Sequence, residues 1–160
     1  MKSSFVIFLF LIFLNITGAQ ELITIHSISK IDSLRDESKN KVIMFNFWAS
    51  WCKPCVKEFP DLIKLNQNYQ DKGFVLILIS LDFPDDVEGK VKPFLKSSNV
   101  NFPVYFGDFK NPDNVMNYFD PKWDGAIPAT FIYDKNGFLK SYVIGDHDYN
   151  FYENLIKAYL

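Results

Sequence analysis

The chain has 160 residues, 48% of them hydrophobic and 18% aromatic, so it can bury one good core, and a single domain is the default expectation. Its formal net charge of −2, with charged residues spread along the chain, gives no reason to expect nucleic acid as a partner. It contains two cysteines, Cys52 and Cys55, and two histidines, His26 and His147.

The N-terminal segment has the pattern of a secretory signal peptide. Lys2 gives it a charged start, residues 5–14 form an unbroken apolar run, and residues 17–19 offer small side chains for cleavage. A permanent membrane anchor is the competing interpretation, but the run is shorter than the roughly 20 residues that a spanning helix needs. We therefore expect residues 1–19 to be removed and residues 20–160 to form a soluble domain in the periplasm, where disulfides persist.

The first part of this domain has the pattern of strand, helix and strand. Residues 21–28 alternate apolar and polar side chains, which predicts an N-terminal edge strand with His26 on the surface. Residues 29–39 carry apolar side chains three apart and predict a short helix. Residues 42–48 form a near-continuous apolar run, typical of a strand buried on both faces. Asn46 interrupts that run, and we expect backbone hydrogen bonds to satisfy its amide.

Cys52 and Cys55 follow this strand at C-x-x-C spacing, where a helical pattern begins. The spacing puts both sulfurs on the first turn of one helix, with Cys52 at the helix start. Unpaired N–H groups, the positive end of the helix dipole and Lys53 should lower the pKa of the Cys52 thiol below its usual value of about 8.5. The pattern predicts a dithiol that opens and closes, with Cys52 as the nucleophile and the deeper Cys55 as the resolving sulfur.

Two other interpretations of the cysteine pair are less favoured. A zinc site needs four ligands, and the chain offers the two cysteines and two distant histidines, so we expect no metal. A purely structural disulfide is conceivable in an exported protein, but a two-residue loop constrains the unfolded chain little.

The sequence around the cysteines resembles a known family. Residues 47–55, FWASWCKPC, resemble the active-site segment of the thioredoxin superfamily. Glu58 and Pro60, three and five residues after the second cysteine, resemble the TlpA/ResA branch of exported thiol–disulfide oxidoreductases. In thioredoxin itself, the position of Asn46 carries an aspartic acid that helps to take the proton from the second cysteine. Because Asn46 cannot titrate, this chain must use another proton acceptor.

The resemblance implies a thioredoxin-like α/β fold. Its central mixed sheet has helices on both faces, with an extra helix and strand inserted before a cis-proline segment.

The helix predicted from Cys55 to Tyr69 has one apolar face, and Glu58 falls within it. A carboxylate there is costly unless it is paired, and a raised pKa would suit Glu58 to shuttle the proton of Cys55. Alternatively, Glu58 lies at the edge of the apolar face and pairs with a lysine. Pro60 lies within this helix and should kink its axis.

The next stretch continues the α/β pattern. Residues 74–81 predict a second buried strand, parallel to the first and joined to it by a right-handed crossover, so active groups belong at the carboxyl ends of these strands. Asp82 is interpreted mainly as a turn residue. The amphipathic helix at 85–98 and the extended piece at 102–105 match the insertion that the resemblance implies, and residues 111–119 make another short helix.

The segment at 123–130 carries the second part of the resemblance. Superfamily members place a cis-proline opposite the cysteines, and Ile127-Pro128 resembles it. A cis bond would expose the backbone of Ile127, which can then pair with an extended substrate strand. Trp123 either walls the substrate groove or fills core. The expected substrate-binding residues are Ile127, Pro128 and Trp123, together with the neighbours of the nucleophile, Trp51, Lys53 and Pro54.

The C-terminal part predicts a hairpin and a helix. Strands at 129–133 and 138–144 flank Asn136-Gly137, which favours a two-residue turn, and residues 149–160 form an aromatic-rich helix. His147 lies between two aspartic acids, which allows metal binding, but a solvated turn is the favoured interpretation.

The predicted function is thiol–disulfide exchange with protein thiols and disulfides through a monomer that has no cofactor. The resemblance implies a reductase of exported proteins such as apocytochromes, re-reduced by a membrane-bound electron donor because the periplasm is kept oxidising. A disulfide oxidase or isomerase, a thiol-based metal-delivery module and a thiol peroxidase of related fold remain as alternatives.

Overall fold

Residues 21–160 are described by a computed structural model. The predicted signal peptide at residues 1–19 lies outside the described residues and stays a prediction. Among the helices of residues 21–160, none combines the length and the apolar character that a membrane span requires.

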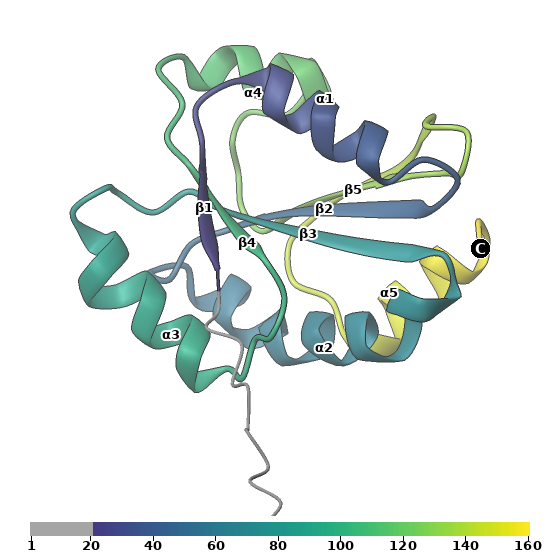
Figure 1. Cartoon of the computed structure of the whole chain (residues 1–160), viewed down its shortest axis with the longest axis horizontal. Helices are drawn as coiled ribbons and strands as arrows, with labels where there is room; N and C mark the ends of the chain where they lie inside the picture. The colour runs from purple at the N-terminus through teal and green to yellow at the C-terminus, as the bar shows by residue number, and fades with distance from the viewer. Residues whose placement is uncertain (1–20) are drawn as a thin grey trace, which may run out of the picture.

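Strands and helices alternate along the chain (Figure 1). The strands are β1 (Leu22–Ile25), β2 (Val42–Trp48), β3 (Phe74–Ser80), β4 (Val104–Gly107), β5 (Ala129–Tyr133) and β6 (Leu139–Ile144). The helices are α1 (Ile28–Glu37), α2 (Lys53–Tyr69), α3 (Lys92–Ser97), α4 (Pro112–Phe119) and α5 (Tyr149–Lys157). A 3₁₀ turn at Gln70–Lys72 ends α2, and a π-helical turn at Val87–Val91 leads into α3. The predicted elements are confirmed, with their ends moved by a few residues.

The six strands form one mixed sheet in the order β1-β4-β3-β2-β5-β6. The pairs β1–β4, β4–β3 and β3–β2 are parallel, whereas β5 is antiparallel to both β2 and β6. The parallel arrangement predicted for β2 and β3 is therefore confirmed, and β1 is an edge strand as expected. The inserted strand, β4, lies inside the sheet between β1 and β3.

Strand register brings three chain segments to one edge of the sheet. Trp48 at the end of β2 pairs with Ser80 at the end of β3, because these strands are parallel and in register. Ala129, the first residue of β5, pairs with Phe47 near the same end of β2, because β5 is antiparallel. The segments that follow β2, follow β3 and precede β5 therefore meet at this edge, which we call the carboxyl edge.

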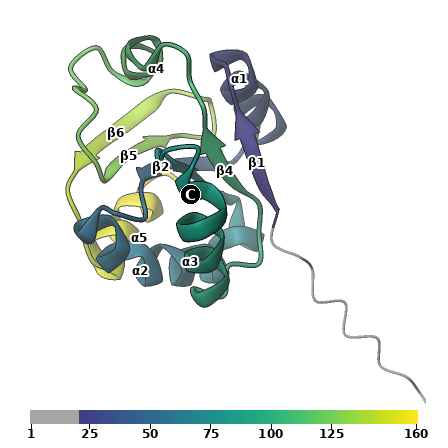
Figure 2. The ribbon, with the colours of Figure 1, turned by 90° about the vertical axis from the view of Figure 1, so that its left-hand side faces the viewer.

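Helices cover both faces of the sheet, with α1 and α4 on one face and α2, α3 and α5 on the other (Figure 1 and Figure 2). The side chains of β2 alternate between the two resulting cores, as a strand buried on both faces requires. Trp48 packs against Phe59 of α2 with ring centroids 4.7 Å apart. Phe47 packs edge-on against Phe119 of α4 with centroids 4.9 Å apart. Both layers are thus fixed by large aromatic contacts.

The β5–β6 connection differs from the predicted two-residue turn. Gly137 has a φ of 80°, but Asn136 is not in the left-handed region, and a two-residue turn of the Asn-Gly type needs both residues there. The backbone N–H of Asp134 instead bonds the carbonyl of Phe138 at 2.9 Å, which leaves a three-residue loop. The Asp134 carboxylate stabilises that loop by accepting bonds from the N–H groups of Asn136 and Phe138.

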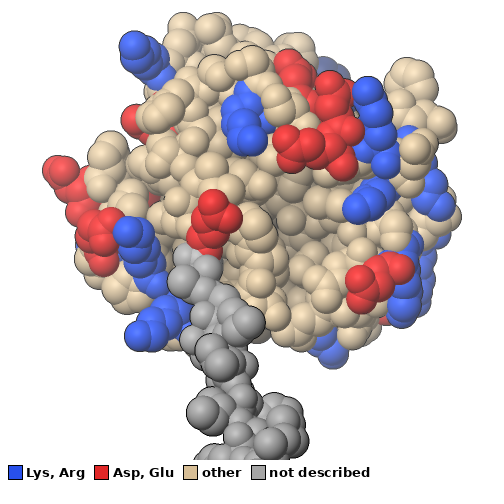
Figure 3. All heavy atoms as spheres, viewed as in Figure 1, with Lys and Arg blue, Asp and Glu red and all other residues tan. Residues whose placement is uncertain are grey.

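The charged side chains on the face shown in Figure 3 are mixed in sign, with Lys and Arg near Asp and Glu. This arrangement agrees with the small net charge of −2.

Candidate active site

The two cysteines lie at the carboxyl edge, where the loop after β2 turns into α2. Cys52 is the N-cap of α2 with extended backbone angles, and Pro54 in the first turn suits a helix start because its missing N–H would have no helical partner there. The sulfurs of Cys52 and Cys55 are joined in a disulfide, with S–S 2.11 Å and Cα–Cα 5.3 Å. The Cys52 sulfur also accepts the backbone N–H of Cys55 at 3.3 Å, so it fills the place of a capping oxygen.

The surroundings of the two sulfurs are unequal. Cys55 is 0% exposed and Cys52 is 5% exposed, whereas Trp51 beside Cys52 is 53% exposed. Lys53 and Pro54 are also exposed. A partner that approaches this edge therefore meets Trp51, Lys53 and Pro54 around the sulfur of Cys52.

The Ile127–Pro128 segment lies against the disulfide. The Ile127–Pro128 peptide bond is cis, as the resemblance implied. The carbonyl oxygen of Ile127 lies 3.8 Å from the sulfur of Cys52. Because a disulfide sulfur carries no proton, this is a van der Waals contact in the oxidised state. Ile127 is half-buried and Pro128 is buried, with its carbonyl bonded to the N–H of Gly145 at 2.9 Å.

Glu58 is a buried carboxylate, 2% exposed, on the sheet-facing side of α2. Its Oε1 accepts from the side-chain amide of Asn46 at 2.9 Å. Its Oε2 accepts from the hydroxyl of Tyr152 at 2.8 Å and from the backbone N–H of His147 at 3.3 Å. The neighbouring Lys57 pairs with Asp146 at 2.6 Å instead. These contacts support the buried interpretation of Glu58 over the lysine-paired one.

Burial raises the pKa of Glu58 from an ordinary value of 4.5 to about 6, because the charged form loses solvation. Hydrogen bonds from Tyr152, Asn46 and the His147 N–H favour the carboxylate and limit this rise. Glu58 follows Cys55 by three positions on α2, so their Cβ atoms are neighbours on the helix surface. Glu58 is thus a buried carboxylate with a raised pKa, three positions along α2 from the buried Cys55.

Asn46 was expected to bond the backbone, and the structure corrects this. Its amide nitrogen donates to Oε1 of Glu58 and, at 3.0 Å, to the hydroxyl of Thr130. Its Oδ1 is buried without a hydrogen-bond partner in the described part of the chain. The reason is the inward position of Asn46 on β2, which aims its side chain at α2 and β5 rather than along its own strand. Asn46 therefore donates to the buried carboxylate of Glu58.

A pocket of about 370 Å³ links Glu58 to the surface. Its lining consists of Lys57, Glu58, Asp61, Asp146, His147, Asp148 and Phe151. Glu58 therefore lines a pocket on the side of α5.

The side chains of residues 146–148 have other partners than a metal. Asp146 pairs with Lys57, the ring of His147 stacks on Phe151 with centroids 3.8 Å apart, and Asp148 accepts the N–H of Phe151 at 2.9 Å as the N-cap of α5. Within residues 21–160, no group of three His, Cys, Asp or Glu side chains is arranged to hold a metal ion.

Trp123 belongs to the core. It is 4% exposed and packs on Phe47 at 4.7 Å between centroids. Its indole N–H donates to the carbonyl of Ala126 at 2.8 Å, directly before Ile127. The structure thus supports the core alternative for Trp123, with a link through the backbone to the segment beside Cys52.

Asp82 was interpreted as a turn residue, but its carboxylate is buried and bonded to Ser50, in the loop before Cys52. No local pattern in the sequence signals this contact, because Ser50 lies 32 positions earlier.

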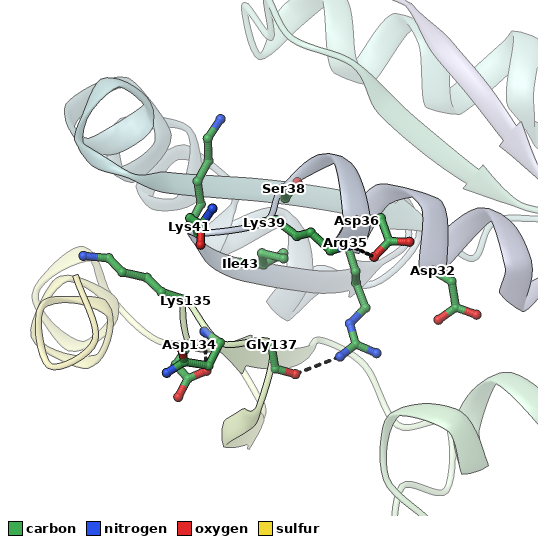
Figure 4. A pocket seen from close by; sticks show the side chains of 12 residues that line it. Asp32, Arg35, Asp36, Ser38, Lys39, Lys41, Ile43, Asp134, Lys135 and Gly137 are labelled. Carbon is green, nitrogen blue, oxygen red and sulfur yellow. Dashed lines mark hydrogen bonds and ion pairs between the residues drawn. The ribbon is translucent and has the colours of Figure 1, made fainter.

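A larger pocket of about 580 Å³ lies at the opposite edge of the sheet, between the end of α1 and the β5–β6 loop (Figure 4). Arg35 spans it by donating to the carbonyl of Gly137 and the hydroxyl of Tyr118, both at 2.8 Å. Its guanidinium lies 4.6 Å from the ring centroid of Tyr133. Arg35 thus holds α1, α4 and the hairpin together, away from the cysteines.

The chain is similar in sequence to a protein family and to individual known proteins. The family model described as the AhpC/TSA family matches residues 24–142. A thiol–disulfide oxidoreductase ResA of Bacillus cereus is 33% identical over 108 residues, which cover 68% of this chain and 57% of that ResA. The thioredoxin-like protein YneN of Bacillus subtilis (strain 168) is 34% identical over 116 residues, which cover 71% of this chain and 61% of YneN. The chain therefore spans about three fifths of the length of these relatives.

Solved structures agree on the fold. A thioredoxin-family thiol:disulfide interchange protein of Chlorobium tepidum TLS superposes with a TM-score of 0.64 at 24% identity, over 78% of this chain and 83% of that protein. StoA of Bacillus subtilis superposes with a TM-score of 0.57 at 22% identity, over 72% of this chain and 82% of StoA. The thioredoxin-like fold expected from the sequence is confirmed.

Proposed function

This chain belongs to the AhpC/TSA family of thioredoxin-like proteins, and on that basis we propose that it is a thiol–disulfide oxidoreductase that reduces disulfides of exported proteins. One observation carries the proposal. Cys52 and Cys55 form a disulfide at the start of α2, with Glu58 bonded into a buried polar network one turn further on. This arrangement supports the roles of Cys52 as nucleophile, Cys55 as resolving sulfur and Glu58 as proton acceptor.

The reaction starts from the reduced pair. The Cys52 thiolate attacks a disulfide of the partner, forms a bond to one partner sulfur and expels the other as a thiolate, which takes a proton. The Cys55 thiol passes its proton to the Glu58 carboxylate and attacks the sulfur of Cys52. The first partner sulfur leaves as a thiolate, and the Cys52–Cys55 disulfide forms. The partner gains the two electrons that the pair loses.

The roles of the two cysteines follow from their surroundings. Cys52 lies beside the exposed Trp51, whereas Cys55 is fully buried. The N–H of Cys55, which bonds the Cys52 sulfur at 3.3 Å, would also stabilise a thiolate there, together with the helix dipole. Both features favour attack through Cys52.

The substrate is an extended protein segment that carries a cysteine oxidised in a disulfide. Ile127 lies against the Cys52 sulfur, so a segment paired with the Ile127 backbone would hold a sulfur of its own disulfide in line with the Cys52 thiolate. Trp51, Lys53 and Pro54 would contact the residues on either side. The protein acts as a monomer outside the cytoplasm after cleavage of residues 1–19, and a membrane-bound donor returns electrons to the pair.

Trapping of mixed disulfides tests the assignment of roles. Cys55→Ser should accumulate a mixed disulfide between Cys52 and an oxidised protein, seen on a non-reducing gel, because nothing resolves it. The matched variant Cys52→Ser should accumulate none, since the remaining sulfur is buried. Equal trapping by both variants would show that the roles are wrong.

The reduction potential of the pair tests the direction of electron flow. A value near about −270 mV supports a reductase, and a value between about −120 and −180 mV favours an oxidase or isomerase. Rapid consumption of hydrogen peroxide that is lost in Cys52→Ser would instead favour the peroxidase alternative.

A further inference from the structure

The carboxylate of Asp82 is a buried group that the proposed reaction does not use. Asp82 is 4% exposed and lies just beyond β3 at the carboxyl edge. Its Oδ2 accepts from the N–H of Ser50 at 2.9 Å and from the hydroxyl of Ser80 at 2.7 Å. Its Oδ1 accepts from the N–H and the hydroxyl of Ser50 at 3.1 and 2.5 Å. Both oxygens are thus engaged, and Ser50 supplies most of the donors.

These contacts exceed what the turn after β3 needs. That turn has its own backbone bond, from the N–H of Asp86 to the carbonyl of Phe83 at 2.9 Å. The Asp82 carboxylate instead reaches across to the loop that follows β2. Burying a carboxylate costs free energy unless several donors form hydrogen bonds to it. The carboxylate of Asp82 and the donors of Ser50 therefore hold one another in place.

Ser50 lies inside the turn that presents the nucleophile. The N–H of Cys52 bonds the carbonyl of Ala49 at 3.1 Å, so residues 49–52 form one turn with Ser50 and Trp51 at its centre. Holding Ser50 by both its backbone and its side chain therefore sets the direction of Trp51 and of the Cys52 sulfur. In the oxidised protein the disulfide also restrains Cys52, but in the reduced protein that restraint is gone.

We propose that Asp82 is a positioning residue for thiol exchange: by holding Ser50, it keeps the Cys52 sulfur aligned with a substrate segment on Ile127 after the disulfide opens. The inference rests on the proposed function of the cysteine pair. It requires that loss of the carboxylate slows attack on an aligned substrate more than attack on a small disulfide, which needs no alignment.

Two probes with the same leaving group separate these cases. One is an extended peptide whose single cysteine carries a thionitrobenzoate, and the other is the small symmetrical disulfide of thionitrobenzoate. Both release a coloured thiolate when reduced Cys52 attacks. In Asp82→Ala, we expect the rate with the peptide probe to fall by about 10- to 100-fold, the loss that follows misplacement of reacting groups, and the rate with the small probe to change much less.

Asp82→Asn has the same shape and keeps one acceptor oxygen, so its rate with the peptide probe should fall by less than that of Asp82→Ala. This variant also carries the test if Asp82→Ala does not fold. Asp134→Ala is the matched control. Asp134 also accepts two backbone N–H bonds in a turn, but it follows Tyr133, which pairs with Ile43 at the opposite edge of the sheet. This control should lower stability and leave the ratio of the two rates unchanged.

Each outcome is decisive. If folded Asp82 variants attack both probes as fast as the unmodified protein does, the positioning role is wrong. It is also wrong if the variants attack both probes more slowly by the same factor. An equal slowing would indicate an effect on the thiol itself. If the unmodified reduced protein attacks neither probe, the proposed function fails, and the inference fails with it.

Discussion

Glu58→Gln should change how the stability of the oxidised protein depends on pH. Glu58 is buried, and its pKa of about 6 in the folded protein lies above the ordinary value of 4.5. Between these two values the folded protein holds the proton more tightly than the unfolded chain, so the free energy of unfolding falls as pH rises. Glutamine does not titrate, so the variant lacks this contribution.

The magnitude follows from the two pKa values. A difference of one pH unit corresponds to about 1.36 kcal/mol, so a rise from 4.5 to about 6 corresponds to about 2 kcal/mol. This stabilisation is fully present below pH 4.5, where Glu58 is protonated in both states, and it is lost as pH rises through about 6, where the buried carboxyl ionises. Relative to Glu58→Gln, the unmodified protein should therefore lose about 2 kcal/mol between about pH 4 and 8.

Urea denaturation of both oxidised proteins across this pH range measures the effect. In the oxidised state neither cysteine titrates, and the other titrating groups cancel in the difference between the two proteins. The absolute stability of Glu58→Gln also reflects altered hydrogen bonds to Tyr152 and His147, so the slope of the difference against pH is the quantity to compare. A difference that stays constant across the range, or that grows in favour of the unmodified protein as pH rises, would refute the assignment.

Two further variants test the surroundings of the site. Tyr152→Phe removes a hydroxyl that donates to Glu58 at 2.8 Å, so the pKa of Glu58 should rise further and the loss of stability should be larger at about pH 8 than at about pH 5; an equal loss at both pH values would contradict this. Phe119→Ala removes a buried ring that packs on Phe47 and Phe131, and urea denaturation should show a loss of about 3–5 kcal/mol. A loss below about 1 kcal/mol would show that this core collapses around the cavity.

Sequence patterns predicted the elements well because the strands are continuous apolar runs. Residues 42–48 and 74–80 are buried in nearly every position, which leaves little ambiguity about β2 and β3. The predicted two-residue turn after β5 is wrong because the carboxylate of Asp134 stabilises a longer loop, an effect that the Asn-Gly pair alone does not show.

In the site, too, the features that depend on local spacing are predictable from the sequence, and the contacts between distant residues are not. The cysteine pair depends on spacing along one helix, so the sequence was sufficient to predict it, whereas helical spacing alone allows Glu58 either within the apolar face or at its edge. The partners of Glu58 were not predictable, since Tyr152 lies 94 positions away. The contacts of Asp82 are unpredictable for the same reason, because its partner Ser50 lies in another loop.

The partners of Glu58 also set the order in which the site becomes complete during folding. Cys52, Cys55 and Glu58 all belong to the first half of the chain, but two of the three donors to the carboxylate, His147 and Tyr152, come from its final segment. A partly folded chain in which α5 has not yet docked thus contains both thiols, but Glu58 lacks two of its donors and the cover that α5 provides. The carboxylate beside the dithiol has its full set of donors only after α5 docks against α2.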